Sequence, residues 1–137
     1  MFAPAVLFFS CKKDENKNSG CAVNVSSVSG SYKFTAYKYR ANSTAAEQDY
    51  FNIIFSDPCE RDDVLTLNSN GSWILADAGV VCTPPGDDTG IWSLTGNTLN
   101  VDGDLATIES FDCKTLVLLN TDVIVTGDKV RIYLTKQ

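Results

Sequence analysis

From residue 28 onward, apolar and polar residues alternate in short runs that glycine, asparagine and aspartate separate. In this part of the chain, no helical period of apolar residues persists over a dozen positions. Short alternating runs bounded by turn-forming residues are typical of β-strands. The pattern therefore predicts an all-β domain over residues 28–137, with about eight to ten strands in up-and-down order.

The first expected strand, residues 31–40, contains a break in its alternation. Tyr32 and Phe34 fall on one face before the phase changes at Tyr37 and Tyr39. One extra residue in a strand changes which side chains face the core, so the break predicts a β-bulge or a sharp coil.

The next stretch is less uniform. Residues 41–49 show no clear period and predict either a short helix or a long loop. Residues 50–56 alternate, with Phe51, Ile53 and Phe55 on one side, and therefore predict another strand.

Later segments predict hairpins, because glycine next to asparagine or aspartate favours a tight reversal. The expected turns are Asn70-Gly71, Gly96-Asn97 and Gly127-Asp128. The last turn should follow a long strand that begins at residue 115. Closure removes exposed strand edges, so we expect a single antiparallel β-barrel of about eight strands, with a flatter sandwich as the alternative. A barrel of this size holds only side chains or one small ligand.

The N-terminal segment has a different character. Residues 2–9 are apolar except for Pro4, a length that suits a signal peptide and is too short to cross a bilayer. The polar segment KKDENKNSG that follows Cys11 has nothing to bury and predicts an unstructured tether. We therefore expect a signal-peptide remnant over residues 1–10 and a flexible tether over residues 11–27.

This N-terminus resembles the lipobox of bacterial lipoproteins, in which an apolar run and a small residue precede a cysteine that carries lipid after cleavage. The sequence LFFSC carries the match and places Cys11 at the lipidated position. The KKDE that follows resembles the signal for surface export of lipoproteins in Bacteroidetes. The resemblance implies an anchored outer-membrane lipoprotein of the cell envelope, exposed at the surface. The alternative is a packed N-terminus in which Cys11 is a free or disulfide-bonded thiol.

Composition narrows the classes of function. The chain has 137 residues with 44% apolar and 20% charged residues, which suits one globular domain. Its net charge is −6 and its bases are scattered, which disfavours a nucleic-acid partner. The chain has no histidine, which removes Ser-His-Asp and Cys-His nucleophiles and histidine-ligated metals. We therefore expect a monomer that is not an enzyme, with no catalytic residue, cofactor or metal.

Three strands share a glycine followed two residues later by an aromatic residue, at Gly30, Gly71 and Gly90. The glycine permits a positive φ or a close approach of the backbone, and the aromatic side chain faces one side of the sheet. Such aromatics fill the core or contact a ligand, and the first role is the more common. The candidates for lining a ligand cavity are Tyr32, Trp73, Trp92 and Tyr133.

The segments CERDDVLTLNSNGSWIL, GIWSLTGNTLNV and TIESFDCKTLVL together resemble the lipocalin-like domain of Bacteroidetes lipoproteins, over most of residues 28–137. The resemblance implies a small lipid-anchored barrel that binds a small hydrophobic ligand, and a bond between Cys59 and Cys82. In lipocalins, an arginine packs over the Gly-x-Trp of the first strand and closes the barrel floor. Arg131 is the candidate for that role here, above Tyr32.

The cysteines beyond Cys11 are even in number, which in an exported chain predicts disulfides with three connectivities open. No C-x-x-C spacing occurs, so a zinc site is disfavoured. With Cys59–Cys82 implied by the resemblance, Cys21 is left to pair with Cys113. The clustered acids, including Asp62 and Asp63, are expected to be solvated turn residues rather than a calcium site.

Two functions are consistent with these expectations. The first is a lipid-anchored module with a small apolar molecule in the barrel mouth. The second is a protein or glycan interaction domain that uses the loops 41–49 and 79–88 on a solid barrel. The interior volume of the barrel separates the two.

Overall fold

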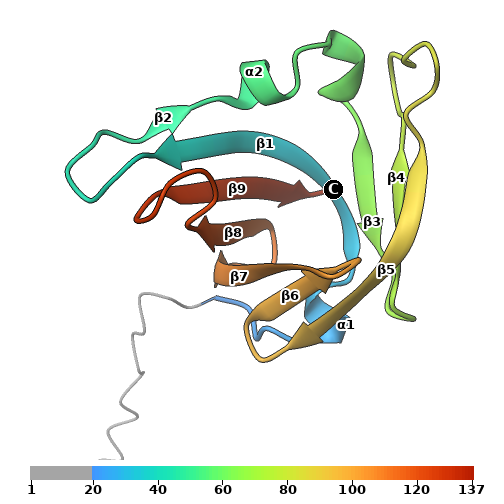
Figure 1. Cartoon of the computed structure of the whole chain (residues 1–137). Coiled ribbons are helices and arrows are strands. Elements are labelled where there is room, and N and C mark those ends of the chain that lie inside the picture. Colours follow the sequence, from blue (N-terminus) through green and yellow to red (C-terminus); the bar gives the residue numbers. More distant parts are fainter. Residues whose placement is uncertain (1–19) are drawn as a thin grey trace, which may run out of the picture.

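Figure 1 shows the computed structural model of the chain, which describes residues 20–137. It contains nine strands in one antiparallel sheet, and a pairing of β1 with β9 closes the sheet. The strands are β1 (Gly30–Arg40), β2 (Gln48–Asp49), β3 (Val64–Leu67), β4 (Ser72–Ala76), β5 (Asp88–Thr95), β6 (Thr98–Val101), β7 (Asp104–Phe111), β8 (Thr115–Thr121) and β9 (Lys129–Lys136). Because β2 lies outside the closure, eight strands form the ring, which confirms the expected antiparallel up-and-down class.

The ring has two different ends, which we call the floor end and the mouth end. The connections β3–β4, β5–β6 and β7–β8 lie at the floor end, together with both ends of the described chain. The connections β1–β3, β4–β5, β6–β7 and β8–β9 lie at the mouth end. Helix α1 (Val25–Val28) lies at the floor end, at the bottom of Figure 1, and helix α2 (Phe51–Ile54) lies near the top of that view.

The expected break in the first strand is confirmed. The register between β1 and β9 shifts between Phe34 and Ala36, and beyond the shift Tyr37 pairs with Ile132 and Tyr39 with Val130. Because paired residues share a face of the sheet, Tyr37 and Tyr39 are inward-facing like their partners. The bulge therefore gives the long strand two inward sets of aromatic residues.

The strand expected over residues 50–56 was wrong. The segment contains α2, followed by the 3₁₀ turn η1 (Pro58–Glu60). Phe51 and Phe55 are four residues apart, one helical turn, and their rings pack with centroids 5.0 Å apart. Phe55 also packs on Phe34 of β1 at 5.3 Å, whereas Ile53 is 67% exposed. The four-residue spacing of Phe51 and Phe55, which suggested a strand, therefore places them on the same side of one helical turn.

The ambiguous segment 41–49 is mostly turn and ends in the short strand β2, which pairs with the mouth end of β1. The Asp49 carboxylate accepts hydrogen bonds from the backbone amides of Tyr37 (3.2 Å) and Phe51 (2.9 Å). This one side chain therefore ties β1 to the start of α2.

The predicted hairpins are present at Asn70-Gly71 and Gly96-Asn97, but the last one differs from expectation. Strand β8 ends at Thr121, and residues 122–128 form a longer loop. Asp128, fully buried, accepts hydrogen bonds from the amides of Val123, Ile124 and Val125 at 2.7–2.9 Å. These local bonds compete with the strand ladder and end it early.

A single apolar core fills the floor half of the ring. Its buried members are Val28, Tyr32, Leu67, Trp73, Trp92, Leu99, Ile108, Phe111, Leu116 and Leu134. On the closing strand, Val130 and Leu134 are buried and Ile132 packs against the core, so alternate residues of β9 face inward. Burial of these side chains from every strand region of the ring supplies the main driving force for closure.

The floor is closed by Lys136 and not by Arg131, which corrects the role that the family resemblance implied for Arg131. The Lys136 ammonium lies 5.9 Å from the ring centroid of Tyr32 and donates a hydrogen bond to the Ser27 carbonyl at 2.8 Å. Gly30, with φ +143°, leaves room for the Lys136 stem, because a Cβ there would overlap it. Arg131 lies on the outer face of β9 and pairs with Glu47 (2.7 Å) and Glu109 (2.9 Å).

Both expected disulfides are present, Cys59–Cys82 and Cys21–Cys113. The second bond joins the N-terminal segment to the turn between β7 and β8. Helix α1 is capped by Asn24 and buries Val28 completely. The ordered domain therefore begins before residue 28, and part of the expected tether belongs to the barrel floor. Residues 1–19, which include Cys11, lie outside the described part of the chain.

Candidate functional site

The mouth end contains a cavity of about 380 Å³ above the packed core. Its lining comes from the ends of β1, β6, β7, β8 and β9 and from the loop before β9. The lining residues are Tyr37, Leu99, Val101, Asp104, Leu105, Ala106, Leu118, Asn120, Val123, Val130 and Ile132. Such a volume lies within the range of about 300–1,000 Å³ usual for small-molecule sites. A mostly apolar cavity of this size suits one small apolar molecule.

Strand register explains why these side chains meet. Leu118 pairs with Ile132 and Asn120 with Val130 across β8 and β9. Val101 pairs with Asp104 across the β6–β7 hairpin. Paired residues share a face, so these positions continue the inward face of the ring beyond the core. Most side chains at the mouth are aliphatic and leave space between them, whereas the floor is filled by the larger aromatic side chains of Tyr32, Trp92 and Phe111.

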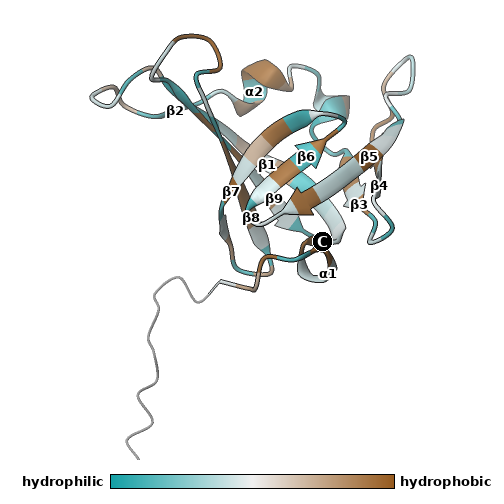
Figure 2. Ribbon diagram, turned by 60° about the horizontal axis from the view of Figure 1, so that its bottom comes forward, coloured by the Kyte–Doolittle hydropathy of each residue, from teal (hydrophilic) through white to brown (hydrophobic). Residues whose placement is uncertain are grey.

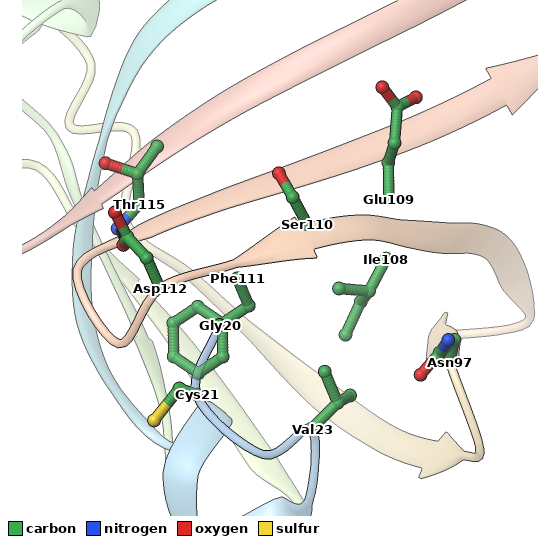
Figure 3. Close-up of a pocket in the computed structure, with 10 residues that line it drawn as sticks. All are labelled: Gly20, Cys21, Val23, Asn97, Ile108, Glu109, Ser110, Phe111, Asp112 and Thr115. Atoms are coloured by element: carbon green, nitrogen blue, oxygen red, sulfur yellow. Dashed lines mark hydrogen bonds between the residues drawn. The ribbon is translucent and has the colours of Figure 1, made fainter. Parts of the chain in front are cut away.

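A second cavity, of about 750 Å³, lies at the floor end (Figure 3). Val23 of the N-terminal segment and the β7 residues Ile108 and Phe111 converge there below the strand, while Glu109 points away from them. Its acids are already engaged: Glu109 pairs with Arg131, and Asp112 accepts hydrogen bonds from the amides of Lys114 and Thr115. Those amides, Thr115 first, lower the pKa of Asp112. We therefore regard the smaller, apolar mouth cavity as the stronger candidate site.

None of the four aromatic residues expected to line a ligand site belongs to the lining of either cavity. Three of them are core residues whose polar atoms bond within the protein. The Tyr32 hydroxyl donates to the Val28 carbonyl (2.6 Å), and Trp92 Nε1 donates to the Asn68 carbonyl (2.8 Å). Trp73 Nε1 donates to the Asp102 carboxylate at 3.0 Å. Burial raises the pKa of Tyr32 to about 12.

Tyr133, the fourth expected lining residue, lies on the outer face of β9. It alternates with the inward Ile132 and Leu134, and its ring is covered by the Lys38 ammonium at 4.8 Å. Arg131 lies on the same outer face. Tyr133 therefore contributes to an external cation–π contact rather than to the interior.

The acids of the mouth end mostly organise its loops. The Asp77 carboxylate accepts hydrogen bonds from the amides of Cys82 (3.0 Å) and Gly86 (2.7 Å), and Asp62 accepts one from Val80 at 2.6 Å. Among residues 20–137, no group of three or more acidic, cysteine or histidine side chains is arranged to hold a metal ion. Asp62 therefore stabilises a loop, as expected of a turn acid, whereas Asp63, which the sequence predicted to be solvated, is buried.

Asp63 is buried, with 8% of its surface exposed, and its Oδ1, like that of Asp62, has no hydrogen-bond partner in the described residues. Burial, followed by the charges of Asp77 and Asp62, raises the pKa of Asp63. Asp128 behaves in the opposite way. Burial alone would raise its pKa, but the amides of Val125, Ile124 and Val123 outweigh burial and lower it.

Seven of the eleven large apolar side chains that are exposed among residues 20–137 lie on the mouth loops. These seven are Ile53 and Ile54 of α2, Val80 and Val81 of the β4–β5 loop, and Val123, Ile124 and Val125 of the β8–β9 loop. Figure 2 shows α2 as a hydrophobic element near the top of the view. Ile124, 74% exposed, is the most accessible of these residues. We call these residues the apolar loop tips.

No protein-family model matches the chain, and no curated protein sequence matches it. The fold and the site define the class by themselves: a closed, disulfide-bonded antiparallel β-ring with a packed floor and an apolar cavity at its mouth. Among residues 20–137, no helix has the length and apolar composition needed to cross a membrane.

The lining of the mouth cavity was not identified from the sequence, although signals for part of it were present. Tyr37 was singled out by the phase change in β1, and Asp104 lies among the turn acids. The inward alternation of β8 and β9 could have named Leu118, Val130 and Ile132. The alternation predicts which face of the sheet a residue is on. It does not predict the height of the residue along the barrel axis, because that height depends on the stagger between strands.

Proposed function

We propose that this chain is a lipid-anchored binding protein of the cell envelope whose barrel mouth takes a small hydrophobic molecule. The observation that carries the proposal is the cavity of about 380 Å³ with its mostly aliphatic lining. Transfer of an apolar ligand from water into such a space is favourable by roughly 25 cal/mol per Å² of buried apolar surface. The proposed role is binding and requires no catalytic residue.

Two further features support the anchored, exported setting. Both disulfides suit an oxidising compartment. The chain enters the described domain at Gly20, at the floor end, so a tether from an anchor at Cys11 would join the barrel at the end opposite to the mouth. An anchored barrel would therefore leave its mouth accessible from the side away from the membrane.

The binding proposal is tested with N-phenyl-1-naphthylamine, a neutral apolar probe whose fluorescence rises on transfer from water. Ala106→Phe places a large ring in the cavity, and Thr107→Phe places the same ring on the exposed outer face of the same strand. We expect probe binding in the native protein and in Thr107→Phe, and at least about tenfold weaker binding in Ala106→Phe. Equal affinity in all three proteins, or no probe binding in any, would overturn the proposal.

The anchor is tested separately by expressing the full chain with an intact export signal and fractionating the cells. We expect the native protein in the membrane fraction, with a lipid-sized mass increase on the peptide that begins at Cys11. Cys11→Ala should abolish both results. An unmodified Cys11 in the mature protein would refute the anchor without affecting the cavity.

A second candidate function, interaction with a protein partner through the mouth loops, is favoured by the apolar loop tips. Large exposed apolar patches often mark an interaction site, and these side chains all lie at the mouth end of the ring. Photo-cross-linking from Ile124 and Val80 in the native cells would detect such a partner. Cross-links confined to floor positions such as Lys114 would exclude this role for the loops.

A further inference from the structure

The polar groups of the mouth cavity are suited to one end of a particular kind of ligand. We propose that the ligand is a single-chain amphiphile whose polar end is a protonated amine, held by Asp104. This inference rests on the proposed binding function and adds the chemical class of the ligand.

Asp104 is the charged residue of the cavity lining, and the lining contains no lysine or arginine. It pairs with Val101 next to the β6–β7 turn, on the face that lines the cavity, and it is exposed to solvent, so it lies at the rim of the cavity. Among the described residues, its carboxylate makes no hydrogen bond to a protein group and no ion pair, unlike Asp102 next to the same turn, which bonds Trp73 and Ile91. The carboxylate is therefore free to receive donors from a ligand.

The other polar groups at the cavity also favour a donor. Asn120 donates its Nδ2 to the Leu105 carbonyl at 2.8 Å, which orients the amide and leaves its Oδ1 as an acceptor. Tyr37 adds a hydroxyl group that can accept a hydrogen bond. An ammonium group has three donors and no acceptor, so it matches a carboxylate, an amide oxygen and a hydroxyl oxygen. A fatty-acid carboxylate would face Asp104 with like charge and no compensating base.

The charge of the whole mouth end acts in the same direction. The loops and strand ends there carry most of the acids of the described chain: Glu47, Asp49, Asp57, Glu60, Asp62, Asp63, Asp77, Asp87, Asp88, Asp102, Asp104, Asp122 and Asp128. The acids outnumber the bases of this end, Lys38, Arg40, Arg61 and Lys129, so the mouth end carries a net negative charge. A net charge of one sign raises the local concentration of ligands of the opposite sign. A cation is therefore attracted to the mouth before it contacts Asp104.

The test compares decylamine, decanol and decanoate as competitors of N-phenyl-1-naphthylamine at pH 7 and low salt. These ligands share one chain and differ in the charge of the polar end. We expect decylamine to bind about tenfold more tightly than decanol, the discrimination of one charge-assisted hydrogen bond, and decanoate to bind most weakly. Added salt should reduce the advantage of the amine and leave decanol unchanged.

Asp104→Asn should remove the advantage of decylamine without weakening decanol. Asp88→Asn is the matched control, because it removes the same charge from the mouth end at an exposed position outside the cavity. If decanol or decanoate binds the native protein as tightly as decylamine, or if Asp104→Asn leaves the order unchanged, the amine assignment is wrong while the binding function stands. If no competitor displaces the probe and Ala106→Phe changes nothing, the binding function itself is wrong.

Discussion

The closure of the floor by Lys136 leads to a specific prediction for stability. Replacing Lys136 by methionine keeps an unbranched stem beside Gly30 and removes the ammonium group. The change deletes the 2.8 Å hydrogen bond to the Ser27 carbonyl and the contacts of the ammonium with the rings of Tyr32 (5.9 Å) and Phe111 (5.8 Å). Helix α1 then loses its link to the last strand.

The expected cost follows from these contacts. A hydrogen bond from a charged group contributes roughly 1.5–3 kcal/mol, and partly exposed cation–π contacts add about 0.5 kcal/mol each. Because Lys136 is partly exposed to solvent, we expect less than the sum of these contributions, about 2 kcal/mol of the free energy of unfolding. For a domain of this size, that corresponds to a fall in Tm of about 8 °C.

The assay is urea unfolding of the oxidised full chain, followed by tryptophan fluorescence and circular dichroism. Arg131→Met is the control, since it removes two exposed ion pairs on the outer face, worth about 1 kcal/mol or less together. An equal or larger loss in Arg131→Met would refute the reasoning and return the floor-closing role to Arg131. If Lys136→Met lowers the free energy of unfolding by less than about 0.5 kcal/mol, the contacts of the ammonium group do not stabilise the floor.

Two more predictions concern backbone approach and buried charge. Gly90→Ala should destabilise the fold by about 2 kcal/mol in urea unfolding, because the added Cβ would overlap the Asp102 carboxylate and the Trp73 indole. Gly86→Ala is the control and should cost under about 1 kcal/mol, because there is space for a Cβ at that position. Equal costs for the two variants would contradict the tight packing at Gly90. The raised pKa of Asp63 means that the folded state holds this proton more tightly than the unfolded chain, so its stabilising effect is present below the ordinary pKa of 3.8 and is lost as pH rises through the raised value. Asp63→Asn should therefore raise the free energy of unfolding at pH 7 by about 1 kcal/mol, and by less below pH 3.8. Asp88→Asn is the control. An increase in stability of Asp63→Asn over this control that does not depend on pH would show that the charge of Asp63 is not the cause.

Where the sequence predicted well, the relevant interactions were local. The hairpin at Asn70-Gly71 depends on the turn residues themselves, and the bulge in β1 is visible as a change of phase. The strand predicted over residues 50–56 failed because Phe51 and Phe55 satisfy both a strand period and one helical turn. The choice between the two was made by the packing of Phe55 on Phe34, a contact between distant parts of the chain.

The candidate site shows the same division. The sequence placed the aromatics Tyr32, Trp73 and Trp92 on one face of their strands, but it could not say whether that face was filled or hollow at their level. In the structure, hydrogen bonds to Val28, Asp102 and Asn68 satisfy their polar atoms and hold them in the packed core. The cavity lies instead where Leu118, Val130 and Ile132 meet.

By itself, the sequence determined the all-β class, the antiparallel order and most turns, because alternation and turn chemistry act between near neighbours. The disulfide pairs were expected only with the help of the resemblance, and the structure contains both. Only the tertiary structure decided that Lys136 closes the floor and that the hollow lies at the mouth. These outcomes depend on the stagger between strands when the ring closes. Stagger sets which distant side chains share a level of the barrel, and no local pattern contains it.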